Sequence, residues 1–168
     1  MGFASTYLTE RVLFPEIIKE APDKQTGIIV IVPAFNEPAI NKLLDSLLLC
    51  NEPDCKVEII IIVNAPAEAA KESIENNKKT IINIERWKNE NNNCFFRLFA
   101  FMAGQPSVRG WGVGLARKTG MDEAVRRFNT INNPGGVILN LDADCLVEKN
   151  YFVSVCNEIK PEFIALYF

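Results

Sequence analysis

Two carboxylates one residue apart, Asp142 and Asp144, follow the apolar stretch GGVILNL at residues 135–141. Like charges this close repel each other, so the pair predicts a positive partner. In an extended segment alternate side chains point the same way, and both carboxylates could then reach one ion. Oxygen donors without histidine or cysteine suit Mg²⁺ or Mn²⁺. The alternative is a simple turn that caps a helix expected near residues 148–159.

The rest of the composition excludes several kinds of chemistry. The chain has no histidine, which excludes Ser-His-Asp and Cys-His triads and histidine-ligated zinc. Its net charge of −3 gives no basic surface for nucleic acid. No secretory signal is recognisable, and the longest apolar run, IIIIV, is too short to span a bilayer.

The cysteines indicate a compartment. They are odd in number and have no CxxC spacing, which predicts reduced thiols and a cytoplasmic protein. They are at positions 50, 55, 94, 145 and 156.

Strands are expected where aliphatic and β-branched residues run continuously, with helices between them. The expected strands are residues 27–32, 57–63, 94–101, 136–141 and 163–168. Continuous rather than alternating apolar runs predict burial on both faces, hence a parallel sheet covered by helices. The fold class expected is therefore α/β, with a mostly parallel sheet flanked by helices on both faces.

The expected helices carry further predictions. A helix over residues 9–20 would belong to an N-terminal extension, residues 1–26, packed on a domain at 27–168. A second helix follows Ile40 and could be capped by Asn36 or Glu37. A third begins near Pro66 and gives way to a polar loop, KNENNN.

A fourth helix is expected at residues 113–128. Its i, i+4 charge pairs, Asp122/Arg126 and Glu123/Arg127, are expected to be solvated. Arg117 instead lies on the apolar stripe of this helix, which predicts a partner inside a cleft.

Three strand ends are chemically distinctive: PAFNE (33–37), NAP (64–66) and DAD (142–144). Ligands of open parallel sheets bind at this carboxyl edge. The glycines before the fourth helix are spaced GxGxG, which is neither the dinucleotide fingerprint GxGxxG nor the phosphate loop GxxxxGK[ST].

Four stretches together, IIVIVPAFNE, VEIIIIVNAP, GVGLARKTGMDEA and GVILNLDADCLVEKNYF, resemble the nucleotide-sugar-binding half of glycosyltransferase family 2, which has the GT-A fold. The resemblance covers residues 27–155. It implies a metal-dependent, inverting transfer from a UDP- or GDP-sugar to a saccharide or other hydroxyl acceptor. By position, it implies donor contacts at Pro33, Ala34, Phe35, Glu37, Asn64, Arg117 and Asp142, and Mn²⁺ or Mg²⁺ ligands at Asp142 and Asp144.

The chain departs from the family in two places. Asn64 stands where the family usually has an aspartate that binds the base, which leaves the nucleobase open. No counterpart of the family's general base is recognisable before Phe168, and Glu158 and Glu162 are expected to be surface charges. Because the chain ends inside an expected strand, we expect a truncated domain that lacks the acceptor part and could self-associate through that sheet edge.

Two other functions stay open. A sugar-phosphate nucleotidyltransferase would need a glycine-rich, cationic loop after the first strand, and PAFNEP has neither feature. A non-catalytic nucleotide-binding or scaffold fragment is favoured by the missing base.

Overall fold

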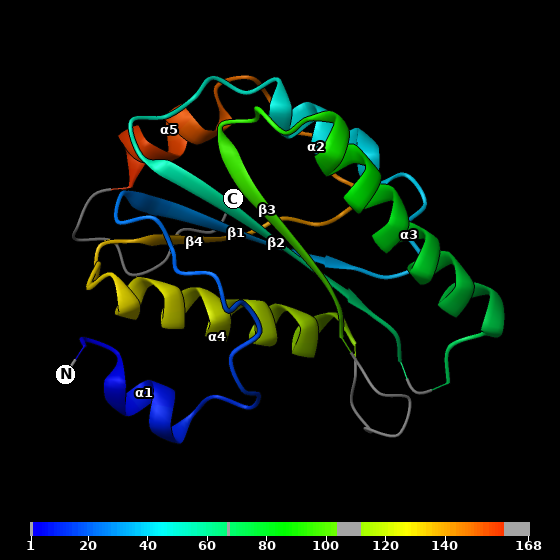
Figure 1. Ribbon diagram of the computed structural model, residues 1–168, viewed down its shortest axis with the longest axis horizontal. Coiled ribbons are helices and arrows are strands. Elements are labelled where there is room, and N and C mark those ends of the chain that lie inside the picture. The colour runs from blue at the N-terminus through cyan, green and yellow to red at the C-terminus, as the bar shows by residue number, and fades with distance from the viewer. Residues whose placement is uncertain (1, 67, 104–111, 160–168) are drawn as a thin grey trace.

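The computed structural model describes residues 2–66, 68–103 and 112–159 (Figure 1). Helices and strands alternate after a short N-terminal helix. In chain order they are α1 (Ser5–Glu10), β1 (Thr26–Ala34), α2 (Ile40–Leu48), β2 (Lys56–Asn64), α3 (Lys71–Glu90), β3 (Phe96–Ala103), α4 (Val113–Thr130), β4 (Val137–Asn140) and α5 (Tyr151–Glu158). Within these residues no helix combines the length and apolarity needed to cross a membrane.

The strands form one parallel sheet in the order β3-β2-β1-β4. The chain builds outward from β1 to β3 and then returns to the other side of β1 as β4. The strand order therefore reverses between β1 and β4, which is the position where open parallel sheets bind ligands.

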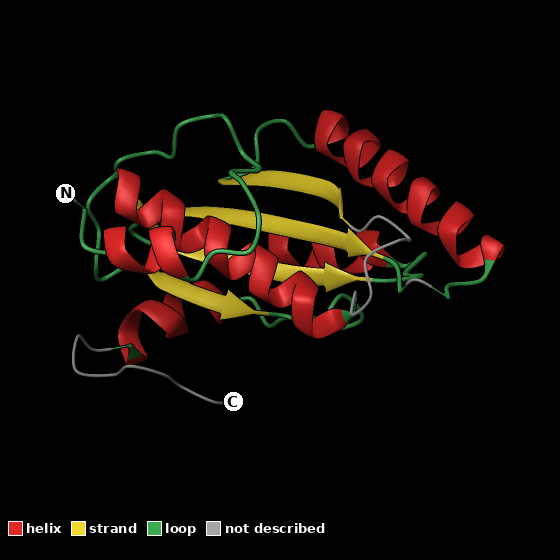
Figure 2. Cartoon of the chain, turned by 90° about the horizontal axis from the view of Figure 1, so that it is seen from below, coloured by secondary structure: helices red, strands yellow, loops and turns green. Residues whose placement is uncertain are grey.

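Helices cover both faces of this sheet, as Figure 2 shows from below. Ile28, Val30 and Val32 of β1 belong to the core shared with α2, α3 and α5. Ile29 and Ile31 belong to the core beneath α4. The predicted α/β class, with a parallel sheet between helical layers, is confirmed.

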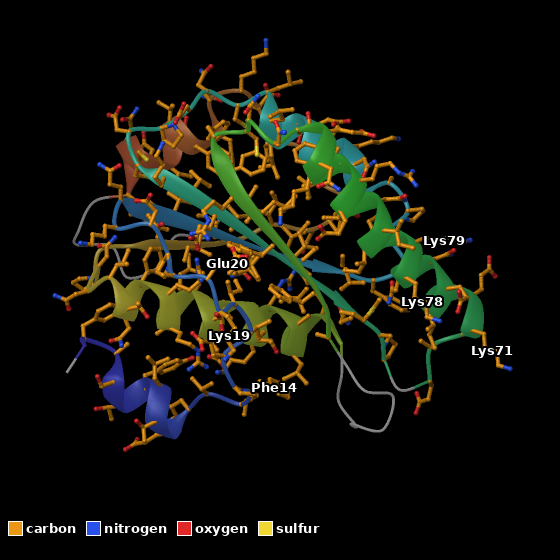
Figure 3. All side chains as sticks on the ribbon, in the orientation of Figure 1. Phe14, Lys19, Glu20, Lys71, Lys78 and Lys79 are labelled. Atoms are coloured by element: carbon orange, nitrogen blue, oxygen red, sulfur yellow. The ribbon has the colours of Figure 1, made fainter. Side chains whose placement is uncertain are left out.

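The expected N-terminal helix is wrong. Only Ser5–Glu10 is helical, and residues 11–25 cross α4 and the sheet as irregular chain. Figure 3 shows this segment passing over α4 from Phe14 to Glu20. Pro15 accounts for the difference, because proline lacks an N–H and clashes with the preceding helical turn.

Two other boundaries also differ. Helix α3 continues through Lys88–Glu90, where a polar loop was expected. Its last turn is held by Trp87, which stacks on Phe96 at a ring-centroid distance of 6.2 Å and donates to Asp45 at 2.7 Å. The strand expected at residues 163–168 lies outside the described residues, so self-association through it stays a prediction.

The charges expected on a solvated face of α4 are buried instead. Asp122, Glu123 and Arg127 are 3%, 1% and 2% exposed. The main-chain N–H groups of Ile17 and Ile18 donate to Glu123 at 3.1 and 3.2 Å. The prediction fails because the N-terminal segment covers this face, and short-range spacing cannot reveal cover that comes from a hundred residues away.

A second part of this ion cluster lies against the sheet. Glu58 of β2 is fully buried and accepts a bidentate pair of hydrogen bonds from Arg127, with Nη2 to Oε1 at 2.7 Å. Arg127 also donates to the carbonyl of Glu20 at 2.8 Å.

Lys118, on the same helix, has a raised pKa. Burial would lower the pKa of Lys118, but its hydrogen bonds to Asp122 and Tyr7 outweigh burial and raise that pKa. These charges are satisfied by protein alone.

Candidate functional site

The ends of β1 and β4 adjoin at the point where the strand order reverses. Ile31 pairs with Asn140, and the N–H of Leu141 donates to the carbonyl of Ile31 at 3.0 Å. Asp142 therefore leaves the sheet beside the last residues of β1. The PAFNE and DAD loops lie together, as the sequence predicts for neighbouring parallel strands.

The β1 side of this edge presents one aromatic ring. Pro33 and Ala34 are buried in the strand, whereas Phe35 is 41% exposed. Asn64, at the end of β2, is 2% exposed, so it lies beneath this surface. An exposed ring at this edge of the sheet suits a planar base that stacks on it.

The expected capping of α2 is wrong. Its N-cap is Ala39, with no side-chain hydrogen bond. Asn36 has a left-handed backbone, with φ of 51°, and is bound to α3. The half-buried Glu37 makes only a long contact of 3.4 Å with the N–H of Ala39. The loop is thus fixed from α3, through both the main chain and the side chain of Asn36.

Asn77 of α3 makes the contact that fixes the PAFNE loop (residues 33–37). The sequence analysis did not identify this residue. Its Oδ1 accepts from the N–H of Asn36 at 2.8 Å, and its Nδ2 donates to the carbonyl of Asn64 at 2.8 Å. Asn77 is 1% exposed. The usable signal was its spacing: Asn77, Thr80, Ile84 and Trp87 form the buried face of α3.

The acidic pair lies in a turn, not in the extended segment that we expected. The N–H of Cys145 donates to the carbonyl of Asp142 at 3.1 Å. Ala143 is buried, whereas Asp142 and Asp144 are both exposed. The chain ends β4 here because residues 142–145 close on themselves, and the buried Ala143 anchors the turn.

Arg117 is the positive partner that the acidic pair predicted. Its Nη2 donates to Asp142 in a close ion pair, which joins α4 to the β4 loop. The side chains are 36% and 54% exposed, so this pair is open to solvent. The Nε of Arg117 is buried without a hydrogen-bond partner. The guanidinium therefore keeps donor capacity that the protein itself does not use.

The donor chemistry here fits a divalent ion that shares its shell with a ligand. Among the described residues no group of three or more His, Cys, Asp or Glu side chains could hold a metal. Mg²⁺ commonly uses one or two carboxylates and completes its shell with waters and substrate phosphates. Asp142 and Asp144 are the two carboxylates that this edge of the sheet offers as ligands, and the remaining ligands would be waters and substrate phosphates.

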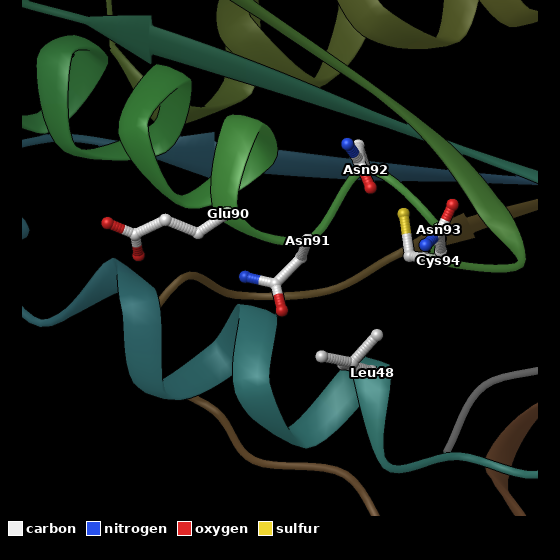
Figure 4. A pocket seen from close by; sticks show the side chains of 6 residues that line it. All are labelled: Leu48, Glu90, Asn91, Asn92, Asn93 and Cys94. Atoms are coloured by element: carbon white, nitrogen blue, oxygen red, sulfur yellow. The ribbon is translucent and has the colours of Figure 1, made fainter.

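Two cavities in the described part of the chain lie away from this edge. One, of about 220 Å³, is lined by Leu48 and residues 90–94 (Figure 4). The other, of about 260 Å³, lies between residues 17–20 of the N-terminal segment, α3 and β3. Neither includes a residue that the resemblance assigns to the donor site.

Comparison with known proteins gives structural neighbours. No family model and no curated protein matches the sequence. TarS from S. aureus, residues 1–349, is 17% identical over 77% of this chain and 31% of that one, with a TM-score of 0.46. Its complex with UDP-GlcNAc gives 18% identity over 77% of this chain and 30% of that one, with a TM-score of 0.43.

Another neighbour is the mannosyltransferase PcManGT from Pyrobaculum calidifontis, solved with GDP-Man and Mn²⁺. It is 17% identical over 92% of this chain and 37% of that one, with a TM-score of 0.47. The chain thus spans between 30% and 37% of the length of these three structures. The expected resemblance to glycosyltransferases is met by these neighbours, and family 2 stays a prediction. TM-scores below 0.5 leave the function to be argued from this chain's own residues.

Proposed function

We propose that this chain binds a nucleoside-diphosphate sugar at the carboxyl edge of its sheet, as the donor-binding part of a metal-dependent, inverting glycosyltransferase. The observation that carries the proposal is the exposed Asp142–Arg117 pair beside Asp144, at the point where the strand order reverses. A site that offers both signs of charge to solvent suits a ligand that brings a cation and a diphosphate together.

Each residue has a role in this proposal. Phe35 stacks on the base, the buried Asn64, Pro33 and Ala34 support the surface beneath it, and Glu37 lies at its border. Asp142 and Asp144 hold the divalent ion, which when bound supplies positive charge to the departing diphosphate. Arg117, on leaving Asp142, donates to a phosphate oxygen in a charge-assisted hydrogen bond.

Transfer also requires a base that takes the proton of the acceptor hydroxyl. We assign this role to no described residue. Glu158 is exposed at the end of α5, whose first residue, Tyr151, comes eleven positions after the last residue of β4, Asn140. The donor-binding role is therefore the part of the activity that these residues can perform.

Thermal unfolding with UDP and GDP tests the proposal. With Mn²⁺ and ligand about a hundredfold above Kd, one of the two should raise the unfolding temperature by on the order of 5 °C. Asp144→Ala should abolish the rise. Asp54→Ala, which removes an exposed carboxylate elsewhere, should leave it unchanged. Equal stabilisation in EDTA would refute the metal role, and no stabilisation by either nucleotide would refute the proposal.

A non-catalytic nucleotide-binding protein is the second candidate, because the described residues supply no base. It predicts the same thermal shifts without turnover of UDP- or GDP-sugars, alone or with acceptors. A nucleotidyltransferase would instead bind a nucleoside triphosphate and release pyrophosphate from it in the presence of a sugar phosphate.

A further inference from the structure

The buried amide of Asn77 connects the two loops that form the base side of the proposed site. Its oxygen and nitrogen each bind one main-chain group, at the ends of β1 and β2, both at 2.8 Å. These partners lie 41 and 13 residues away in sequence. A buried amide that satisfies both of its functions across two strands fixes their separation.

Neighbouring residues of α3 strengthen the same connection. Asn76 donates to the side-chain oxygen of Asn36 at 2.9 Å. Thr80 donates to the carbonyl of Glu37 at 3.2 Å. The left-handed backbone of Asn36 is a sparsely populated conformation, which persists because surrounding contacts over-determine it. Three contacts from one helix therefore hold Asn36 and Glu37, the two residues that follow Phe35 and its exposed ring.

We propose that Asn77 is a positioning residue for nucleoside recognition, which sets Phe35 and Asn64 at the spacing that a base requires. The inference rests on the proposed function. It assigns Asn77 to the base and ribose half of the ligand, whereas the diphosphate and metal belong to Asp142, Asp144 and Arg117. Loss of Asn77 should therefore weaken nucleotide binding and spare pyrophosphate binding.

A purely structural role for Asn77 predicts something different. It would lower the stability of the chain while the folded molecules kept their affinity for every ligand. The ratio of UDP affinity to pyrophosphate affinity separates the two roles. A positioning role lowers UDP affinity alone, a purely structural role changes neither affinity, and non-specific loosening of the fold lowers both affinities.

The experiment is calorimetric titration of the 168-residue chain with UDP, GDP and pyrophosphate in Mn²⁺, below the unfolding temperature of every variant. Asn77→Leu keeps the side chain's branching at Cγ and removes both hydrogen bonds. We expect its Kd for the preferred nucleotide to rise at least ~10-fold, with less than a ~2-fold change for pyrophosphate. Ile84→Ala is the control, because it creates a cavity on the same buried helix face without touching either loop.

Equal nucleotide affinity in Asn77→Leu and the wild type would overturn the inference, as would the same loss in Ile84→Ala. If Asn77→Leu does not fold, Asn76→Ala at a half-buried position carries the test, with an expected ~3-fold loss for nucleotide only. An unchanged Kd there would also overturn it. If the wild type binds pyrophosphate but neither nucleotide, the proposed function fails and the inference falls with it.

Discussion

The two ends of helix α4 carry similar charged residues under opposite conditions. At its start, Arg117 pairs with Asp142 in solvent and keeps a buried, unpaired Nε. Towards its end, Glu123 and Arg127 are buried and hydrogen-bonded to the N-terminal segment and β2. The same residue types thus form an ion pair open to solvent in one place and a buried cluster that stabilises the fold in the other.

The difference lies in what each charge would lose on changing partner. A solvent-exposed ion pair contributes ~0–1 kcal/mol, so a metal or phosphate can replace one of its members. Removing one partner of a buried pair leaves a desolvated charge and costs ~3–5 kcal/mol. The N-terminal end of α4 is therefore free to exchange ligands, and the C-terminal end is not.

Arg127→Met should give the largest effect, because it leaves the fully buried Glu58 with only the 3.3 Å contact from Arg97 in place of its bidentate partner. We expect a loss of ~3–5 kcal/mol in the free energy of unfolding, measured by urea titration. Adding Glu58→Leu should recover much of that loss, since the double variant buries no orphaned charge. A loss below ~1 kcal/mol in the single variant would contradict the division of α4 into two regions.

Gly120→Ala tests the point between the two regions, where Gly120 of α4 packs against Ile31 of β1. A Cβ there would lie 2.4 Å from Cγ2 of Ile31 in β1. Such overpacking typically costs ~1–3 kcal/mol in the free energy of unfolding. Gly114→Ala is the matched control on the same helix, because nothing lies within 4 Å of its added Cβ. Equal stability of the two variants would show that α4 can shift on β1.

Arg117→Gln should separate binding from stability at the exposed end. We expect a change of less than ~1 kcal/mol in unfolding free energy, because its ion pair is open to solvent. Nucleotide affinity in Mn²⁺ should fall ~10-fold through loss of the phosphate contact. Arg86→Gln, at an exposed position of α3, should change neither quantity. A large stability loss in Arg117→Gln would place this end of α4 with the buried cluster.

The smallest effect concerns Tyr151, which follows the acidic loop at the start of α5. Burial raises the pKa of its hydroxyl to about 12, and the thiols of Cys50 and Cys145 add to the rise. The neutral form is favoured in the folded state, so its stability is complete below pH 10 and is lost between pH 10 and 12. Tyr151→Phe should flatten the fall of stability in that window by at most ~1.4 kcal/mol per pH unit. Identical alkaline unfolding curves would place Tyr151 in a solvated environment.

The parts of the fold that sequence could predict depend on short-range patterns. Continuous aliphatic runs located β1 and β2 within two residues, because strands buried on both faces leave no alternation. The helix expected at residues 9–20 was wrong because Pro15 interrupts it, and because Ile17 and Ile18 use their main-chain N–H groups in tertiary contacts. Their amides bind Glu123, a partner that only the tertiary fold supplies.

The residues of the candidate site also divide into those that the sequence indicated and those that it did not. Asp142 and Asp144 were visible because carboxylates after an apolar strand are chemically conspicuous, and Arg117 because it interrupts an apolar stripe. Asn77 was not, since its spacing indicates only the buried face of α3, whereas its two partners lie in loops far away in sequence. The turn at residues 142–145 was only the alternative to an extended segment, because two carboxylates one residue apart are compatible with either conformation.

Calorimetric titration with UDP and GDP, in Mn²⁺ and in EDTA, tests the central claim that the exposed acidic pair serves a metal-bound nucleotide. We predict that Mn²⁺ strengthens binding of the preferred nucleotide by at least ~10-fold in the wild type and in Asp54→Asn. In Asp144→Asn the Mn²⁺ advantage should disappear and leave the weaker, metal-free affinity. An undiminished Mn²⁺ advantage in Asp144→Asn would contradict the account.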